Sequence, residues 1–111
     1  MTQRSDEDRL YQAQAEICKT FANPWRLRIV ETLSEDELAV GQLAEAIEIP
    51  KSNLSQHLAI MRDRGVVEAR RDGAHVYYRL TSPKILTACR MMREVLLEGF
   101  TRGAELVRTS Q

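Results

Sequence analysis

The side chains best suited to chemistry form a polar series between residues 51 and 62. Leu54, Leu58 and Met61 recur there at helical spacing, so the residues between them share the opposite helix face. That face carries hydroxyl, amide and cationic groups, from Lys51, Ser52, Ser55, Gln56 and Arg62, with Asn53 and His57 at its edges. Glutamine offers a paired donor and acceptor that match adenine, and lysine and arginine reach phosphates. The series therefore predicts a helix that reads duplex DNA; the alternative is a solvated helix surface in a protein-interaction module.

A second basic group lies on a predicted β-hairpin at residues 66–80. Two β-prone runs, 66–70 and 75–80, flank the segment RDGA, whose Asp-Gly pair favours a tight turn. Four basic side chains surround this tip: Arg70, Arg71, His75 and Arg79. An exposed basic finger can touch phosphate or the minor groove, although charge on a hairpin can also serve only to prevent aggregation. We favour DNA, because the helix and the hairpin follow each other in the order that lets both face one duplex.

The elements that position these groups form a single predicted domain over residues 1–111. Apolar spacing predicts a helix over 5–22 with Ser5 as N-cap, a second helix that begins at Asn23-Pro24, a third over 40–47 and a fourth over 51–64. The pair within 40–64 forms a helix-turn-helix, and the hairpin at 66–80 forms a wing. A last long helix covers 83–108. The expected fold class is mainly α with a small β-hairpin, a winged helix-turn-helix.

Charge is unevenly distributed along a chain whose 16 basic and 16 acidic residues cancel. Residues 1–50 hold five basic and ten acidic side chains, whereas residues 51–80 hold six and three. Local charge decides phosphate binding, so a neutral chain can still bind DNA through this basic segment. No run approaches the roughly 20 apolar residues of a membrane span and no secretory signal is evident, so we expect a cytoplasmic protein. The absence of CxxC, phosphate-loop and HExxH motifs argues against an enzyme.

The two cysteines, Cys18 and Cys89, lie on apolar stripes of the first and last predicted helices. They are too few for a disulfide framework or a four-ligand zinc site within one chain, and we expect no cofactor. Three roles remain open for the pair: inert packing, which we favour; a thiol switch that responds to sulfide, persulfide or an oxidant; and ligation of a metal or metalloid. For the thiol switch we predict that Cys18 and Cys89 come within disulfide reach, with their Cα atoms about 4 to 7 Å apart.

The last helix carries more apolar residues than a domain of this size needs for its own core. Met92, Leu96 and Phe100 continue one stripe at a spacing of four residues. We expect these three side chains to form a homodimer interface. Twofold symmetry would place two recognition helices about 34 Å apart on a palindromic operator.

Two segments of the chain resemble the ArsR/SmtB family of small bacterial winged-helix repressors. They read FANPWRLRIVETL and VGQLAEAIEIPKSNLSQHLAIMRDRGVVEARRDGAHVYYRL, and they match the family's N-P-x-R-L-x-I-L, S-x-x-S-x-H-L and R-x-G-x-x-x-Y-Y patterns over about residues 15–97. The resemblance implies a homodimer through the first and last helices, which leaves its operator when an inducer binds. The implied DNA contacts are Ser52, Asn53, Ser55, Gln56, His57, Arg71 and His75. For His57 we favour a packed, hydrogen-bonded structural role.

The chain departs from the family pattern in the turn before the recognition helix and at the family's sensing sites. Glu48 stands where glycine is usual, and Pro50 stands where a capping serine is common. A left-handed backbone at Glu48 would cost about 1 kcal/mol, so we expect the turn to differ locally from the family's turn. The segment LAVGQ at 38–42 replaces a cysteine motif, and the last helix has no histidine or aspartate, so metal sensing at those sites is not expected. Family members that sense sulfur species with two cysteines place one of them where this chain has Glu31.

We therefore expect a homodimeric repressor that an inducer releases from its operator, with a thiol-based signal as the specific hypothesis for that inducer. Two alternatives remain. One is a metal- or metalloid-responsive repressor that uses Cys18 and Cys89; the other is a winged-helix module that binds protein and has no inducer.

Overall fold

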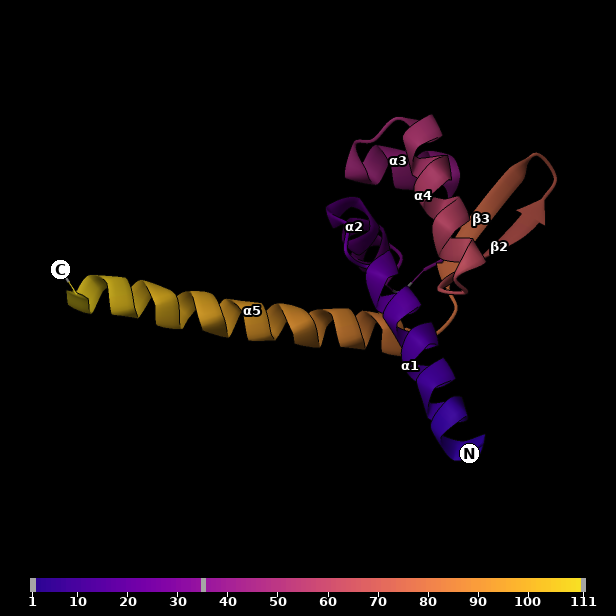
Figure 1. The fold of residues 1–111 in the computed structure, drawn as a ribbon. Helices are drawn as coiled ribbons and strands as arrows, with labels where there is room; N and C mark the ends of the chain where they lie inside the picture. Colours follow the sequence, from indigo (N-terminus) through magenta and orange to yellow (C-terminus); the bar gives the residue numbers. More distant parts are fainter. Residues whose placement is uncertain (1, 35, 111) are drawn as a thin grey trace.

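The computed structural model describes residues 2–34 and 36–110, with side chains described for residues 4–34, 36–100, 102 and 103. The elements follow one another as α1 (Thr2–Thr20), α2 (Pro24–Thr32), β1 (Leu38–Ala39), α3 (Val40–Ile47), α4 (Lys51–Asp63), β2 (Val67–Asp72), β3 (His75–Leu80) and α5 (Pro83–Ser110). Helices α3 and α4 form a helix-turn-helix, and β2 and β3 form a wing beside α4 (Figure 1). The predicted fold class, a mainly helical winged helix-turn-helix, is confirmed.

Helix α2 begins as the sequence predicts, because Asn23 caps it. The Asn23 side-chain oxygen accepts hydrogen bonds from the backbone N–H groups of Trp25 at 2.9 Å and Arg26 at 3.3 Å, and Pro24 occupies the first helical position. The start of α1 differs from the prediction: this helix already begins at Thr2, so Ser5 lies inside it and is not its N-cap. Helix α1 also ends at Thr20 instead of residue 22.

The wing is a three-stranded antiparallel sheet in the order β1-β3-β2. The sequence does not predict β1, because two residues are too few to show an alternation of apolar and polar side chains. Strand β2 extends to Asp72, beyond the predicted run 66–70, since Arg71 pairs with Val76 and Asp72 pairs with His75. A two-residue turn then joins the strands, and Gly73 enters it at φ +62°, a conformation that glycine adopts without steric cost.

The hydrophobic core lies between α2, α3, α4 and the base of the wing. Its fully buried side chains include Ile29 of α2 and Leu43 of α3, and also Leu54, Leu58 and Met61, the three residues that the spacing along α4 assigns to the core. Burial of each such side chain contributes about 1.5–3 kcal/mol to folding. The opposite face of α4 is thereby turned to solvent in one defined orientation.

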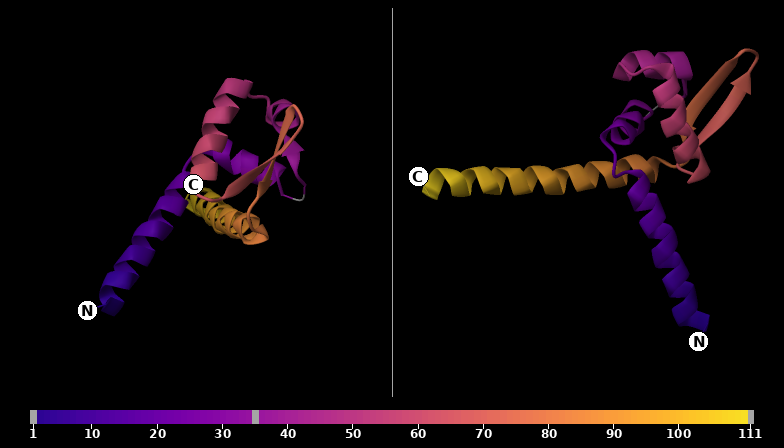
Figure 2. Two further views of the ribbon diagram at one scale, coloured as in Figure 1. Left: turned by 90° about the vertical axis from the view of Figure 1, so that its right-hand side faces the viewer. Right: turned by 45° about the horizontal axis from the view of Figure 1, so that its top comes forward.

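Helices α1 and α5 extend from this body in different directions, as two arms (Figures 1 and 2). The first turns of α5 pack on the core through Ile85, Leu86 and Cys89. Farther along both arms, large apolar side chains are exposed: Leu10, Tyr11 and Ile17 on α1, and Met91, Met92, Val95, Leu96 and Phe100 on α5. Contiguous apolar surface of this kind marks a binding surface for another protein or chain. In the part of the chain that the structure describes, no helix is long and apolar enough to cross a membrane.

Candidate nucleic-acid interface

The exposed face of α4 carries the side chains that the sequence analysis assigns to DNA. Leu54, Leu58 and Met61 are each 0% exposed, so they hold the opposite side of α4 in the core. Six polar side chains on the other faces are exposed: Lys51, Ser52, Asn53, Ser55, Gln56 and Arg62. Within this series Ser52 Oγ donates a hydrogen bond to Asn53 Oδ1 at 3.3 Å. The structure therefore leaves all six predicted residues accessible around the solvent side of α4.

The turn before α4 keeps a left-handed backbone despite the glutamate in it. Glu48 has φ 56° and ψ 53°, which corrects the expectation that this turn would differ locally. Two features hold the conformation: Ile49 is 8% exposed, and its N–H donates to the carbonyl of Ala44 at 3.1 Å, as in a Schellman motif. Burial of Ile49 thus offsets the steric cost at Glu48. Pro50 then precedes α4 without a side-chain cap, so the first N–H groups of α4 are open to an external acceptor such as a phosphate.

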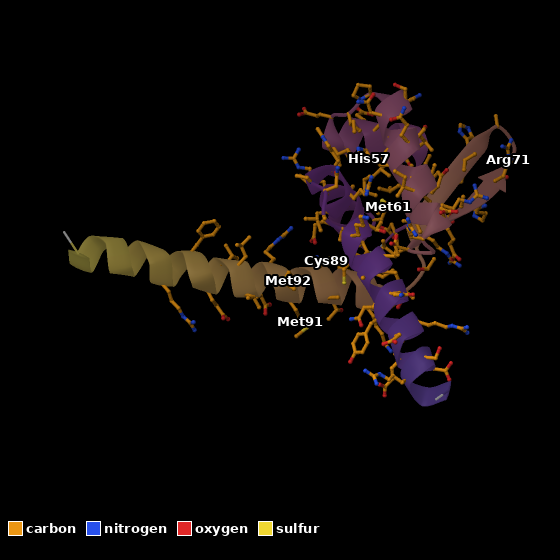
Figure 3. All side chains as sticks on the ribbon, in the orientation of Figure 1. His57, Met61, Arg71, Cys89, Met91 and Met92 are labelled. Carbon is orange, nitrogen blue, oxygen red and sulfur yellow. The ribbon has the colours of Figure 1, made fainter. Side chains whose placement is uncertain are left out.

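The register of the wing separates the two predicted DNA contacts, Arg71 and His75. Directly paired residues share a face of the sheet, and successive residues alternate between faces. Arg71 pairs with Val76 and shares its face with Val67, which is 2% exposed and packs into the core beside α4. His75 pairs with Asp72 on the opposite face. Arg71 therefore lies on the face of the wing whose base packs beside α4. Figure 3 places it near the outer end of the wing.

Two other arginines of the basic finger are paired with carboxylates. Arg70 forms a bidentate ion pair with Glu37 at 2.6 and 3.0 Å, and its guanidinium stacks 4.8 Å from the centre of the Tyr77 ring. The hydrogen bond from Arg70 lowers the pKa of Glu37. Arg79 forms an ion pair with Glu68 across the strands. The wing is consequently less basic than its sequence suggests, and its charge resides mainly at Arg71.

His57 occupies the edge of the α4 face and is half-buried. Arg26 Nε donates a hydrogen bond to His57 Nδ1 at 3.3 Å, so the proton of the neutral ring is on Nε2. Burial, followed by the positive charge of Arg26, lowers the pKa of His57. These contacts support the packed, hydrogen-bonded role that the sequence analysis favours. The sequence gives no indication of the partner, because Arg26 is 31 residues away along the chain.

The two cysteines have different surroundings. Both are free thiols; Cys18 is exposed on α1, and Cys89 is half-buried against the core. Burial raises the pKa of Cys89, and the negative charge of Glu31 raises it further. Glu31 itself accepts hydrogen bonds from Arg90, the shorter at 2.6 Å, which lower its pKa. Among the residues with described side chains, no group of three or more histidine, cysteine or acidic residues is arranged to hold a metal ion. The disulfide distance expected between Cys18 and Cys89 stays a prediction.

The predicted dimer residues lie on the exposed arm of α5. Met92, Leu96 and Phe100 are 69%, 57% and 67% exposed in the single chain. Met91 and Val95 are equally exposed and widen this apolar surface beyond the predicted stripe. Figure 3 shows Met91 and Met92 on different sides of the helix, just beyond Cys89.

Comparison with known proteins identifies relatives of the whole winged helix. Residues 23–69 match the family described as bacterial regulatory protein, arsR family. The chain is 41% identical over 92 residues to the uncharacterized HTH-type transcriptional regulator Rv0081 of Mycobacterium tuberculosis, over 82% of this chain and 81% of that protein. The crystal structure of Rv0081 is similar with a TM-score of 0.77 over 86% of this chain and 96% of that one.

Two further solved structures share the fold. The transcriptional repressor BigR from Xylella fastidiosa has a TM-score of 0.72 at 36% identity, over 83% of this chain and 94% of that one. The homodimeric winged helix-turn-helix DNA-binding domain of Mb0332 from Mycobacterium bovis has a TM-score of 0.77 at 29% identity, over 86% of this chain and 89% of that one.

The matched segment runs from the cap of α2 through the helix-turn-helix into β2, which is the region that builds the exposed α4 face. The resemblance seen in the sequence is thereby confirmed, and so is the expectation of a regulator and not an enzyme. The chain belongs to the arsR family of bacterial regulatory proteins.

Proposed function

We propose that this protein is a transcriptional repressor that inserts α4 into the major groove of an operator and lays the wing against the adjacent backbone. The observation that carries the proposal is the exposed polar face of α4, which is held in one orientation by three fully buried residues on its other side. The sign of regulation is supported by the relative BigR, which is a transcriptional repressor. A DNA partner also implies a cytoplasmic protein.

The side chains on this surface divide into base readers and phosphate contacts. Gln56 lies in the middle of the exposed face and has the paired donor and acceptor that fit an adenine edge. Lys51 and Arg62, near the two ends of α4, are placed for phosphates on either side of the groove, and Arg71 adds a contact from the wing. Ser52, Asn53 and Ser55 are small enough to let the uncapped end of α4 approach the backbone.

A homodimer would bring two such surfaces to one operator. The exposed apolar side chains of α1 and α5 supply a surface for a second copy, and the related domain of Mb0332 is homodimeric. We propose that Met92, Leu96 and Phe100 lie in this interface. Twofold symmetry then places the two α4 helices about one DNA turn, or about 34 Å, apart on a palindromic site.

A binding experiment with a matched pair of variants tests the proposal. The probe is the duplex that the wild-type protein enriches most from a library randomised over roughly 30 base pairs, which covers two half-sites. Gln56→Ala should weaken binding to this duplex by roughly 5- to 150-fold for each half-site, the discrimination that one bidentate base contact provides, because the dimer loses one such contact in each subunit. Gln12→Ala, an exposed glutamine on the face of α1 opposite Leu10 and Ile17, should bind as the wild type does.

The same experiment distinguishes the alternative of a winged-helix module that binds protein. Such a module would enrich no duplex, or would bind DNA without regard to Gln56. Either result, with the dimer intact by sedimentation, would overturn the proposal.

For Cys89 we propose a packing role, because it is half-buried against the core with a raised pKa. A thiol acts as nucleophile and ligand in its thiolate form, which a raised pKa disfavours at neutral pH. Operator complexes of the wild type and of the double variant Cys18→Ser/Cys89→Ser should therefore dissociate alike after treatment with polysulfide, hydrogen peroxide or arsenite. Release of the wild type alone would instead establish a thiol switch in the first two treatments, or a metalloid site in the third.

A further inference from the structure

Arg26 connects two helices that have different tasks in the proposed repressor. It lies in the first turn of α2 and is half-buried. Its Nε donates a hydrogen bond to Nδ1 of His57, in the middle of α4, at 3.3 Å. Its Nη1 donates to the backbone carbonyl of Thr20, the last residue of α1, at 3.3 Å. One guanidinium therefore joins the end of α1 to the recognition helix.

The α1 end of this connection is well anchored. Thr20 is 3% exposed, and its Oγ1 donates to the carbonyl of Glu16 at 2.9 Å. Carbonyls in the last turn of a helix have no partner within the helix, and a positive charge there is favourable to the helix dipole. Arg26 donates to such a carbonyl and places its positive charge at the C-terminus of α1. Its side chain is therefore held by α1 as well as by His57.

A second link also joins α1 and α4. It lies one turn back along α1 and two turns farther along α4. Arg64, which follows the last residue of α4, forms an ion pair with Glu16 of α1 through Nη2 and Oε2 at 2.9 Å. Glu16 and Thr20 are four residues apart and share a face of α1, while His57 and Arg64 are seven apart and share a face of α4. The two links thus fix α1 along two turns of α4. Both side chains of the ion pair are more than 40% exposed, so the ion pair contributes less than the half-buried Arg26.

We propose that Arg26 is a positioning residue that transmits the orientation of α1 to the recognition helix α4. The inference rests on the proposed function, in which the exposed apolar residues of α1 belong to the dimer interface. The two α4 helices of a dimer can occupy successive major grooves only if each is held at a fixed angle to the interface. The Arg26 link supplies this constraint inside each subunit, between an interface helix and the helix that reads DNA.

The test compares Arg26→Gln with Arg28→Gln. The second variant removes the same positive charge two residues farther along α2. The Arg28 side chain is exposed and stacks on the Trp25 ring. Affinity for the duplex selected by the wild type is measured at several salt concentrations, and the dimer dissociation constant by sedimentation. Arg26→Gln should weaken operator binding by about tenfold or more while the dimer constant and the salt dependence stay unchanged. Arg28→Gln should bind as the wild type does.

The salt dependence separates positioning from direct contact. A phosphate contact adds about 0.9 to the slope of log affinity against log salt, so loss of one contact per subunit would lower the slope by about 2 for a dimer. Such a decrease for Arg26→Gln, or wild-type affinity in this variant, would overturn the inference. Failure of the wild-type protein itself to enrich a duplex would instead count against the proposed function.

A second pair of variants, at His57, decides the case if Arg26→Gln does not fold. His57→Gln retains a side-chain oxygen that can accept the hydrogen bond from Arg26, whereas His57→Leu does not. We expect His57→Gln to bind the selected duplex within about threefold of the wild type and His57→Leu to lose about tenfold. Equal affinities of these two variants would overturn the inference.

Discussion

Arg71 and His75 point to opposite faces of the wing, because Arg71 pairs with Val76 while His75 pairs with Asp72. The two residues are only four positions apart, and both lie near the turn at Gly73. The face of Arg71 continues the one that packs beside α4, whereas the face of His75 also carries the paired arginines Arg70 and Arg79. In the proposed complex, a duplex bound to α4 would therefore approach Arg71 more closely than His75.

This geometry predicts different roles for the two wing residues in DNA binding. Arg71→Ala should lower the slope of log affinity against log salt by about 2 for a dimer, since one phosphate contact is lost in each subunit. His75→Ala should leave the slope unchanged, and so should Arg79→Ala, whose guanidinium already has Glu68 as its partner. Fluorescence anisotropy between about 50 and 200 mM salt gives the slopes. Equal slopes for Arg71→Ala and the wild type would show that the wing does not contact phosphate there.

His57 should make the folded state sensitive to acid. Burial and the charge of Arg26 lower the pKa of His57 below its ordinary value of 6.5, so the unfolded chain binds a proton more readily than the folded one. The contribution of the neutral ring is complete above pH 6.5 and is lost as the pH falls through the lowered pKa. Urea unfolding at pH 7.5 and pH 5 should therefore show a larger loss of stability in the wild type than in His57→Gln.

A substitution far from this contact provides the control. Gln12 is exposed on α1, so Gln12→Ala should lose as much stability as the wild type between the two pH values. The same loss in His57→Gln and in the wild type would mean that the Arg26–His57 contact does not control the titration.

The sequence predicts the recognition helix well because apolar residues recur on one face of α4 at helical spacing. Leu54, Leu58 and Met61 are spaced for a single buried stripe, and the remaining positions follow from the geometry of a helix. The cap at Asn23 is likewise local, since its partners are two and three residues away. Both features are determined by neighbours along the chain and need no knowledge of the fold.

The contacts that the sequence does not predict join distant parts of the chain. The pairing of Arg70 with Glu37 depends on β1, which is too short to recognise, and Arg26 meets His57 only once α2 packs beside α4. A count of the basic residues in the sequence therefore overestimates the unpaired charge of the wing, and the sequence does not identify the partner of His57. The conformation of Glu48 also depends on tertiary packing, because burial of Ile49 holds a backbone that the residue type disfavours.

Glu48 offers a site where a substitution should stabilise the protein. Its φ of 56° costs a residue with a side chain roughly 1 kcal/mol or more, whereas glycine adopts this conformation without a clash. Glu48→Gly should raise the free energy of unfolding by up to about 1 kcal/mol, with part of the gain offset by the greater freedom of glycine in the unfolded chain. Guanidinium unfolding measures the change as a shift in the midpoint.

A nearby glutamate in a helical conformation serves as the matched control. Glu45 is exposed inside α3, where glycine is unfavourable, so Glu45→Gly should lower the free energy of unfolding by about 0.5–1 kcal/mol. If both substitutions destabilise the protein equally, the left-handed backbone at Glu48 carries no strain.

Leu96 tests whether the α5 arm is a subunit interface. Its side chain is 57% exposed in the single chain, so Leu96→Glu should leave the fold of each subunit intact. A twofold interface would contain this residue twice, and burial of each apolar side chain contributes about 1.5–3 kcal/mol, so the dimer dissociation constant should rise at least about 100-fold. Glu94→Gln, which removes one charge at an exposed residue on the side of α5 opposite Leu96, should leave that constant unchanged. Sedimentation equilibrium measures the dimer dissociation constant of both variants, and circular dichroism confirms that the helices persist.

Operator affinity should fall together with dimerisation in Leu96→Glu, because a monomer has one α4 helix and cannot bind the second half-site. A stable dimer in this variant would show that the apolar face of α5 binds something other than a second copy of the chain.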